Sequence, residues 1–262
     1  MKKKSEGVIW KGKYSSFEDS SVDIIGPDFF SGEDWKNRSL NSANECLSAL
    51  SSGHSIPQFY KQRTTVLPVV VSMLKTESPN KLKILDFGGS LGIGYMVLKE
   101  SIPGIEERLD YNIVEVKEVC LTGSILFNDV KNIKYYEQIP TKEAIDLVYS
   151  SSTIQYVDDW KGLIKEFGGL NANYILLSDV FAGNNKSFVT LQCYYGSRIP
   201  HWMININDLL VEFDHIGYEL VMKTDVTSQR LNDQDILPMS NFDKNDRIEK
   251  TLHLLFKKKT VC

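Results

Sequence analysis

The sequence predicts an α/β protein with a mostly parallel sheet and a mainly helical N-terminal region. From residue 81 onward, short β-rich runs alternate with segments of helical periodicity, which indicates strands connected by helices. Several of these runs are almost wholly apolar, as expected for strands that helices cover on both faces. The region before residue 81 differs, because Ser, Asn, Asp and Gly are frequent there.

The N-terminal region is expected to form a helical and irregular cap. Apolar residues recur at helical spacing over 41–50, and a second apolar run covers 66–74. A turn signal, Ser-Pro-Asn at 78–80, ends the region. The chain therefore divides into a cap at 1–80 and an α/β domain at 81–262.

Strand candidates of the α/β domain share an apolar centre and lie at 83–87, 111–116, 133–137, 145–150 and 174–179. Helix candidates lie between them, at 92–100, 117–126 and 159–167. Two further strands are predicted at 218–225 and 251–258, joined by a long polar connection without a helix. Because parallel neighbours are usually joined through a helix, this pair predicts an antiparallel end to the sheet.

The composition argues against several classes of protein. A chain of 262 residues fits one large domain, or one domain with an extension. The formal charge of −4 argues against a protein that mainly coats nucleic acid, so no nucleic-acid partner is expected. No apolar run reaches the roughly 18 residues of a membrane span, and the N-terminal charges precede no apolar signal region. We therefore expect a cytoplasmic location, while the oligomeric state stays open.

The four cysteines are far apart and form no C-x-x-C pair. This pattern is typical of reduced thiols and predicts neither a disulfide framework nor a zinc site. No cluster of His, Asp and Glu has the spacing of metal ligands, so we expect chemistry without a metal.

The segment 83–94 carries the pattern with the clearest chemical meaning. It begins as a buried strand and continues into an acidic residue, small residues and a helix. Glycines in such a turn permit positive φ values and a close approach of the backbone to a ligand. Ligands of open α/β sheets bind at the carboxyl ends of the strands. The segment therefore predicts a site for a nucleotide-like ligand.

Three other ligand-binding patterns fail on this segment. The dinucleotide fingerprint requires glycines at i, i+2 and i+5. Starting from Gly88, Ser90 occupies i+2, and starting from Gly92, Val97 occupies i+5. A P-loop needs a Gly-Lys-Ser/Thr that is missing here. The Asp-Phe-Gly triplet at 86–88 has no His-Arg-Asp loop before it, as a protein kinase would.

What remains resembles motif I of the class I methyltransferases, an acidic residue followed by a glycine-rich loop. Here the motif reads Asp86-x-Gly88-Gly89-Ser90-x-Gly92. Glu115 ends the next strand about thirty residues later, within the length of one βαβ unit. The resemblance implies a Rossmann-like fold with a mostly parallel seven-stranded sheet and an antiparallel last strand. It also implies S-adenosylmethionine as the cofactor, with S-adenosylhomocysteine as its product.

The same resemblance implies roles for individual residues. In this family an acidic residue at the position of Glu115 holds the ribose hydroxyls, and a carboxylate can accept two hydrogen bonds from a diol. Segments 145–157 and 174–179 are similar to motifs IV and V of the family. By spacing alone, Glu137 and Gln138 are candidates to receive the adenine amino group. The implied cofactor-binding residues are Asp86, Gly88, Gly89, Ser90, Gly92, Glu115, Val116, Ser151 and Gln155.

A narrower resemblance is to methyltransferases encoded in gene clusters for surface polysaccharides, such as capsule or lipopolysaccharide. It rests on segments that together span most of the chain, at 10–18, 85–92, 150–156 and 194–202, the last leading into 207–210. Ser90 departs from this family, which commonly has a glycine there, and 60–63 follows its tyrosine-led charged motif only loosely. The family implies methyl transfer to a sugar, or to a phosphate-type substituent, of a glycan precursor.

Two alternatives stay open. In the first alternative, the acceptor is an unrelated small molecule that is methylated on O or N. In the second, the chain is a methyltransferase-like binding module without catalysis. The intact set of Asp86, Gly88, Gly92 and Glu115 argues against the second alternative.

Candidate catalytic residues follow from the chemistry of a hydroxyl acceptor, whose proton a general base is useful to remove. Of the four histidines, His201 is the best placed, because it follows the fifth strand in the aromatic-rich segment 194–202. Asp179, at the end of the fifth strand, is a second candidate base. Tyr194, Tyr195 and Trp202, in the same aromatic segment, are candidates for stacking against a sugar face of the acceptor.

Overall fold

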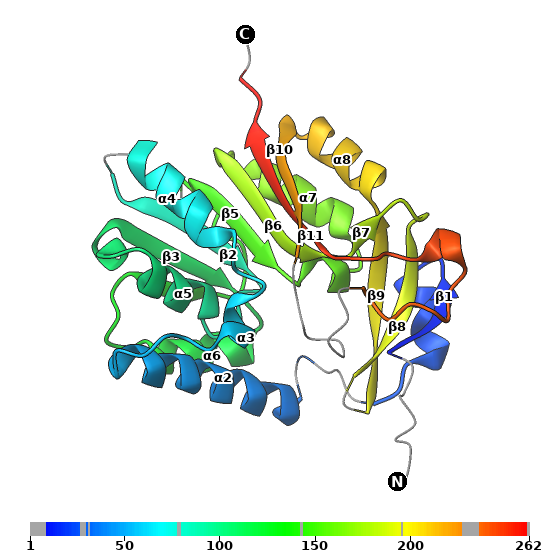
Figure 1. Ribbon diagram of the computed structural model, residues 1–262, viewed down its shortest axis with the longest axis horizontal. Helices are drawn as coiled ribbons and strands as arrows, with labels where there is room; N and C mark the ends of the chain where they lie inside the picture. The colour runs from blue at the N-terminus through cyan, green and yellow to red at the C-terminus, as the bar shows by residue number, and fades with distance from the viewer. Residues whose placement is uncertain are drawn as a thin grey trace.

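The protein contains two β-sheets with helices packed around the larger one (Figure 1). The computed structural model describes residues 9–26, 30, 32–77, 80–141, 144–194, 196–226 and 236–260. Within these ranges, no helix combines the length and hydrophobicity that crossing a membrane requires.

The larger sheet has seven strands in the order β10-β11-β6-β5-β2-β3-β4. Its strands are β2 (Leu82–Phe87), β3 (Leu109–Val114), β4 (Ile133–Tyr136), β5 (Leu147–Ser151), β6 (Tyr174–Val180), β10 (Tyr218–Asp225) and β11 (Leu252–Lys258). Strands β2 to β6 pair in parallel, whereas β11 runs antiparallel to both of its neighbours. The predicted parallel sheet with an antiparallel last strand is therefore confirmed.

Helices cover both faces of this sheet. They are α2 (Glu33–Ser51), α3 (Gln58–Lys61), α4 (Leu67–Glu77), α5 (Ile93–Ser101), α6 (Lys117–Leu126), α7 (Trp160–Gly169) and α8 (Ile206–His215). Short helical turns are α1 (Phe17–Ser20), η1 (Ser21–Asp23), η3 (Ile105–Arg108), η4 (Ile154–Tyr156) and η5 (Lys244–Asp246). Successive residues of a strand point to opposite faces. Accordingly, Ile84 packs in a core with α4 and α5, and Leu85 packs in a second core with α7 and α8.

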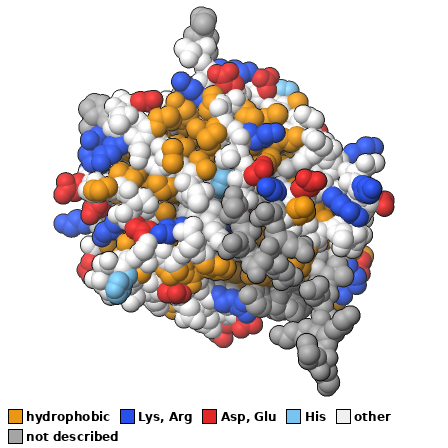
Figure 2. Space-filling view, viewed as in Figure 1, with side chains coloured by type: hydrophobic (Ala, Val, Ile, Leu, Met, Phe, Trp, Pro, Cys, Tyr) orange, Lys and Arg blue, Asp and Glu red, His pale blue; other side chains and the backbone are white. Residues whose placement is uncertain are grey.

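The outer surface of α4 is partly apolar. Figure 2 shows hydrophobic side chains gathered on the face of the molecule that carries this helix. Val69 and Met73 of α4 are 67% and 37% exposed, and neither is among the described residues that line the cavity discussed below. The apolar surface of α4 is therefore separate from the candidate active site.

The second sheet has four strands in the order β1-β8-β9-β7 and lies beside the larger sheet (Figure 1). Its strands are β1 (Trp10–Tyr14), β7 (Ala182–Gly183), β8 (Phe188–Tyr194) and β9 (Ser197–Asn205). The first described strand of the chain thus pairs with β8 rather than packing with the helices of the expected cap. The aromatic-rich segment 194–202 belongs to the β8–β9 hairpin, and Ile199, His201 and Met203 alternate inward along β9.

The connection between β10 and β11 completes this part of the molecule. Its described part, 236–251, packs Met239 and Phe242 against Trp10 of β1. The side-chain amide of Asn241 donates a hydrogen bond to the Trp10 carbonyl oxygen at 2.8 Å. Three segments that are distant in sequence therefore build one wall beside the carboxyl ends of the parallel strands.

Candidate active site

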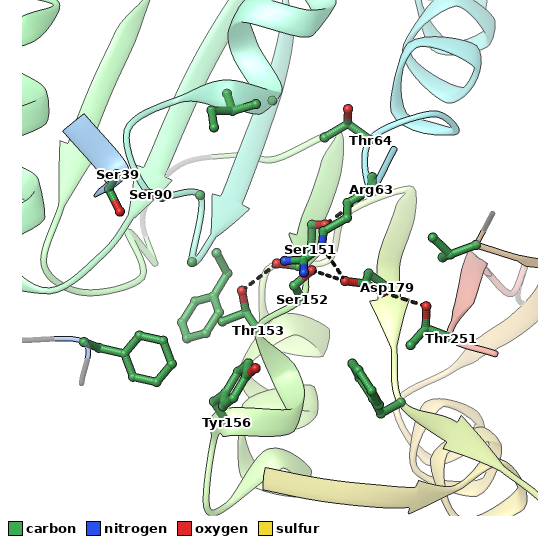
Figure 3. A pocket seen from close by; sticks show the side chains of 18 of the residues that line it. Ser39, Arg63, Thr64, Ser90, Ser151, Ser152, Thr153, Tyr156, Asp179 and Thr251 are labelled. Carbon is green, nitrogen blue, oxygen red and sulfur yellow. Dashed lines mark hydrogen bonds and ion pairs between the residues drawn. The ribbon is translucent and has the colours of Figure 1, made fainter. Parts of the chain in front are cut away.

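A cavity of about 920 Å³ lies at the carboxyl ends of β2, β3, β5 and β6 (Figure 3). One part, here named the cofactor half, is lined by the turn after β2, by the ends of β3 and β4, and by Ser39 and Ser42 of α2. The other part, here named the acceptor half, is lined by the second sheet, the 236–251 segment and the end of β6. Ser151, the last residue of β5, and the two residues after it, Ser152 and Thr153, also line the cavity.

The turn after β2 can be built only with small residues. Gly88 has a φ of +71°, and a Cβ atom there would lie 2.4 Å from Thr153 Cγ2. A Cβ on Gly89 would lie 2.4 Å from Asp86 Oδ2. Ser90 has a positive φ of 49°, a conformation that costs a serine more than a glycine. The glycine pattern read from the sequence therefore reflects backbone conformation and close packing at the wall of the cavity.

Asp86 is a buried carboxylate beneath this turn. Its Oδ2 atom accepts a 2.6 Å hydrogen bond from the hydroxyl of Tyr111, and Oδ1 has no partner in the described part of the chain. Burial raises the pKa of Asp86 to about 7, against the lowering effect of the Tyr111 hydrogen bond, and the nearby Glu115 carboxylate raises it further. An N–H donor or a cation bound at this turn would favour the charged form of Asp86.

This shift makes the stability of the protein depend on pH. Because the folded state holds the Asp86 proton more tightly than the unfolded chain, the free energy of unfolding should fall as pH rises from 4 to 7. The upper bound is about 4 kcal/mol, at about 1.4 kcal/mol per pKa unit. Chemical denaturation over this range should give a shallower fall for Asp86→Asn. Equal slopes for the variant and the unaltered protein would contradict the assignment.

Glu115 follows β3 and is held by the backbone. Its Oε1 accepts a hydrogen bond from Ser90 N–H and its Oε2 one from Val116 N–H, both at 3.0 Å. Burial raises the pKa of Glu115 above its ordinary value, and these two hydrogen bonds oppose the shift. Each carboxylate oxygen keeps further accepting capacity, so the geometry suits two hydroxyl donors of a diol. Val116 and Glu137 line the cavity beside it.

Of the two predicted cofactor-binding residues at and after the end of β5, one lines the cavity and the other is buried away from it. Ser151 lines the cavity, and its hydroxyl donates a hydrogen bond to the Arg63 carbonyl oxygen at 3.5 Å. Gln155 is fully buried, and its side-chain amide donates to the Asp179 carbonyl oxygen at 3.2 Å. It is not among the described lining residues, so its placement supports a role in fixing β6 rather than in binding a ligand.

Asp179 lies at the end of β6 with a positive φ of 54°. Its Oδ2 atom forms an ion pair with Arg63 Nε at 2.8 Å and accepts a hydrogen bond from the Ser152 hydroxyl at 2.5 Å (Figure 3). Its Oδ1 atom accepts a hydrogen bond from the Thr251 hydroxyl at 2.6 Å. With these donors on both oxygens, its role as a proton acceptor stays a prediction.

His201 does not reach the cavity. Its side chain is fully buried on β9, with ring centroids 4.5 to 4.9 Å from those of Trp10, Tyr156 and Phe181. Burial lowers the pKa of His201 to about 3, and the negative charge of Asp179 offsets this only in part. The imidazole is absent from the described lining, so its placement does not support the predicted general base. Tyr195 lies outside the described residues.

Several lining residues were not predicted from the sequence. The acceptor half contains aromatic side chains from separate elements, namely Trp10, Phe30, Tyr156, Phe181 and Tyr194. Arg63 and Thr251, which hold Asp179, come from the segment after α3 and the residue before β11. Of these aromatic residues, Trp10, Tyr156 and Tyr194 fell within segments that the sequence singled out, and Phe30 and Phe181 did not. Among the described residues, no group of three or more metal-ligating side chains is gathered.

The solved structures that this chain is similar to include methyltransferases. The structure is similar to the 1,6-didemethyltoxoflavin-N1-methyltransferase of Burkholderia thailandensis, with a TM-score of 0.52 and 10% identity over 90% of this chain and 94% of that one. It is also similar to an S-adenosylmethionine-dependent methyltransferase of Clostridium acetobutylicum, with a TM-score of 0.50 and 13% identity over 77% and 92% of the two chains. No family model and no curated protein sequence matches the chain. The fold is therefore the Rossmann-like fold of the class I methyltransferases.

Proposed function

We propose that the protein transfers the methyl group of S-adenosylmethionine to a small acceptor. The observation that carries this proposal is the single cavity at the carboxyl ends of the strands, which joins the glycine turn and Glu115 to an aromatic acceptor half. Its volume of about 920 Å³ is near the upper end for small-molecule sites, which leaves room for two ligands. The Burkholderia thailandensis relative was solved with S-adenosylhomocysteine and its acceptor both bound.

In this proposal the cofactor half holds the adenosine and the amino-acid part of the cofactor. Glu115 accepts hydrogen bonds from the ribose hydroxyls. Glu137 follows β4, the neighbouring strand, where it would contact the adenine. The turn from Gly88 to Gly92 provides the close backbone contact, and the charge of Asp86 favours a cationic ligand. When bound, the cofactor supplies an activated methyl group on a sulfonium.

The protein's contribution to the transfer is mainly positioning. In an in-line displacement, a lone pair of the acceptor atom forms the new bond to the methyl carbon while the carbon–sulfur bond breaks. Holding both partners in one cavity converts an encounter into an intramolecular step. None of the four histidines, all within the described ranges, lines the cavity. A strong imidazole base is therefore not part of the proposed mechanism, and Asp179 and Glu249 are carboxylates that line the acceptor half.

For the acceptor we propose a sugar, or a phosphate-type substituent, of a surface-polysaccharide precursor. The support is the resemblance of four sequence segments together with the aromatic faces of the acceptor half, on which a sugar ring can stack. The alternative is a flat heterocycle, because the same aromatic faces suit it and the Burkholderia thailandensis relative binds 1,6-didemethyltoxoflavin. Methyl-transfer assays with both kinds of compound distinguish these acceptors.

Calorimetry with S-adenosylhomocysteine tests the proposal. Binding at micromolar concentrations is expected, and no binding at submillimolar concentrations would exclude the enzyme. Binding without turnover of any glycan precursor or heterocycle would favour the non-catalytic binding module instead.

Removing the Glu115 carboxylate should weaken cofactor binding. Glu115→Ala is expected to cost about 1–3 kcal/mol of binding free energy, the scale for losing hydrogen bonds to a charged group. Calorimetry with S-adenosylhomocysteine measures this loss. Glu118→Ala, which removes an exposed carboxylate from the first turn of α6, is the control and should bind unchanged. An unchanged affinity of the Glu115 variant would show that another group holds the ribose.

A further inference from the structure

Arg63 lies where the cofactor half and the acceptor half meet. We infer that Arg63, held by Asp179, is a binding site for a carboxylate at this junction. The inference rests on the proposed function, because it concerns the same cavity.

The position of Arg63 is fixed from two sides. It lies two residues after α3, and its carbonyl oxygen accepts the hydrogen bond from Ser151 at the end of β5. Its side chain reaches the end of β6, where Nε lies 2.8 Å from Asp179 Oδ2 (Figure 3). The Arg63 side chain is nevertheless 38% exposed and lines the cavity. The guanidinium is therefore oriented by the protein but open to a ligand.

The unused donors of Arg63 match a carboxylate. A guanidinium has five N–H donors, and in Arg63 the Nε atom forms the ion pair with Asp179. In the described part of the chain, no hydrogen bond joins this guanidinium to another residue. The two Nη groups thus keep a fork of parallel donors, the geometry that binds a carboxylate through two hydrogen bonds.

Asp179 acts here as a positioning residue. Its left-handed backbone conformation is unfavourable for a residue with a side chain and persists only when the surroundings fix it. Ser152 and Thr251 supply that restraint by donating to its two oxygens. The Asp179 carboxylate therefore holds Arg63 Nε from a rigid strand end. The two Nη groups are left as donors for a ligand.

Neighbouring groups also present donors. The hydroxyl of Tyr156 donates to Gln192 Oε1 at 2.7 Å, which leaves the side-chain NH2 of Gln192 as the donor of that residue. Lys250, 3.7 Å from Asp225, lines the cavity as well. Glu249 also lines the acceptor half, so it is the fork of Arg63 donors, and not the net charge of the lining, that favours a carboxylate over an amine.

A carboxylate can reach this site from two sources. One is the amino-acid end of S-adenosylmethionine, which must extend from the glycine turn toward β5. The other is an acidic group on the methyl acceptor. Either carboxylate would bind the same fork of donors. The two sources are therefore distinguished by measuring the same variants with different probes.

The first measurement is calorimetry with S-adenosylhomocysteine and with 5′-methylthioadenosine, which lacks the amino-acid part. If the cofactor is the source, Arg63→Gln should weaken S-adenosylhomocysteine binding at least about tenfold and leave 5′-methylthioadenosine binding unchanged. Lys61→Gln is the matched control, because Lys61 is two residues away, pairs with Glu100 and does not line the described cavity.

The second measurement is a fluorine NMR titration of the protein saturated with S-adenosylhomocysteine. If the acceptor is the source, 4-fluorobenzoate should bind at least about tenfold more weakly to Arg63→Gln than to Lys61→Gln. Binding of the neutral 4-fluorobenzyl alcohol should be equal in both variants.

The inference is overturned if Arg63→Gln and Lys61→Gln have equal affinities for both S-adenosylhomocysteine and 4-fluorobenzoate. The role of Arg63 would then be limited to its ion pair with Asp179. Arg63→Lys keeps the charge but loses the fork, so it should show a smaller loss for the same probe, and it decides the matter if Arg63→Gln does not fold. A failure of the unaltered protein to bind S-adenosylhomocysteine would instead remove the proposed function.

Discussion

Gly88→Val should abolish binding of S-adenosylhomocysteine, with an affinity loss of at least about a hundredfold. Residue 88 has a φ of +71°, which a β-branched side chain adopts only at a cost of about 1–3 kcal/mol. A Cβ there would also lie 2.4 Å from both Cγ2 and Oγ1 of Thr153. Relief of this clash must move the turn or Thr153, both of which line the cavity. Calorimetry measures the loss of affinity, and thermal unfolding measures the loss of stability.

A matched control separates backbone strain from the damage to the cavity. Gly104 has a φ of +68°, but a Cβ there would meet nothing within 4 Å, and the residue does not line the described cavity. Gly104→Val should therefore lose a similar amount of stability from strain and keep its affinity for S-adenosylhomocysteine. If Gly88→Val bound as tightly as Gly104→Val, the turn after β2 would not be the cofactor site.

The cofactor half of the cavity was predictable because its signal is local. The acidic strand end, the glycine turn and the start of α5 occupy one short stretch of sequence, so that the conformation of the turn demands glycine where the ligand approaches. The role of Glu115 was implied by the family resemblance, and its place at the carboxyl end of the neighbouring parallel strand puts it at the same edge of the sheet. The strands of the larger sheet were predicted for a related reason, because burial on both faces leaves continuous apolar runs.

The acceptor half was not predictable, because contacts between distant segments create it. Arg63, Asp179 and Thr251 meet only through the packing of the cap segment, β6 and β11, and no local spacing records that meeting. The second sheet was not predicted, although 188–194 is rich in β-forming residues. The alternation of Ile199, His201 and Met203 indicates a strand with His201 turned inward, which is where it lies. The division of the chain at residue 80 stays a prediction.

Trp10→Ala should destabilise the protein by about 3–5 kcal/mol, the usual cost of removing a large aromatic side chain from a core. Trp10 is fully buried, and its ring centroid lies 5.4 Å from that of Phe181 and 4.9 Å from that of His201. It also joins β1 to the 236–251 segment, whose Phe242 packs in the same cluster. Denaturant unfolding measures the loss, and Trp202→Ala, at a half-buried position of β9, should cost less.

The same variant tests whether the two halves of the cavity are separable. Trp10 lines the acceptor half and belongs to a core distinct from the two that pack on the larger sheet. At temperatures where Trp10→Ala is folded, it should therefore bind S-adenosylhomocysteine with unchanged affinity while losing methyl transfer. Loss of cofactor affinity in step with loss of structure would show that the second sheet supports the glycine turn as well. A stability loss below about 1 kcal/mol, well under the usual cost for a buried Trp, would show that β1 is not packed as described.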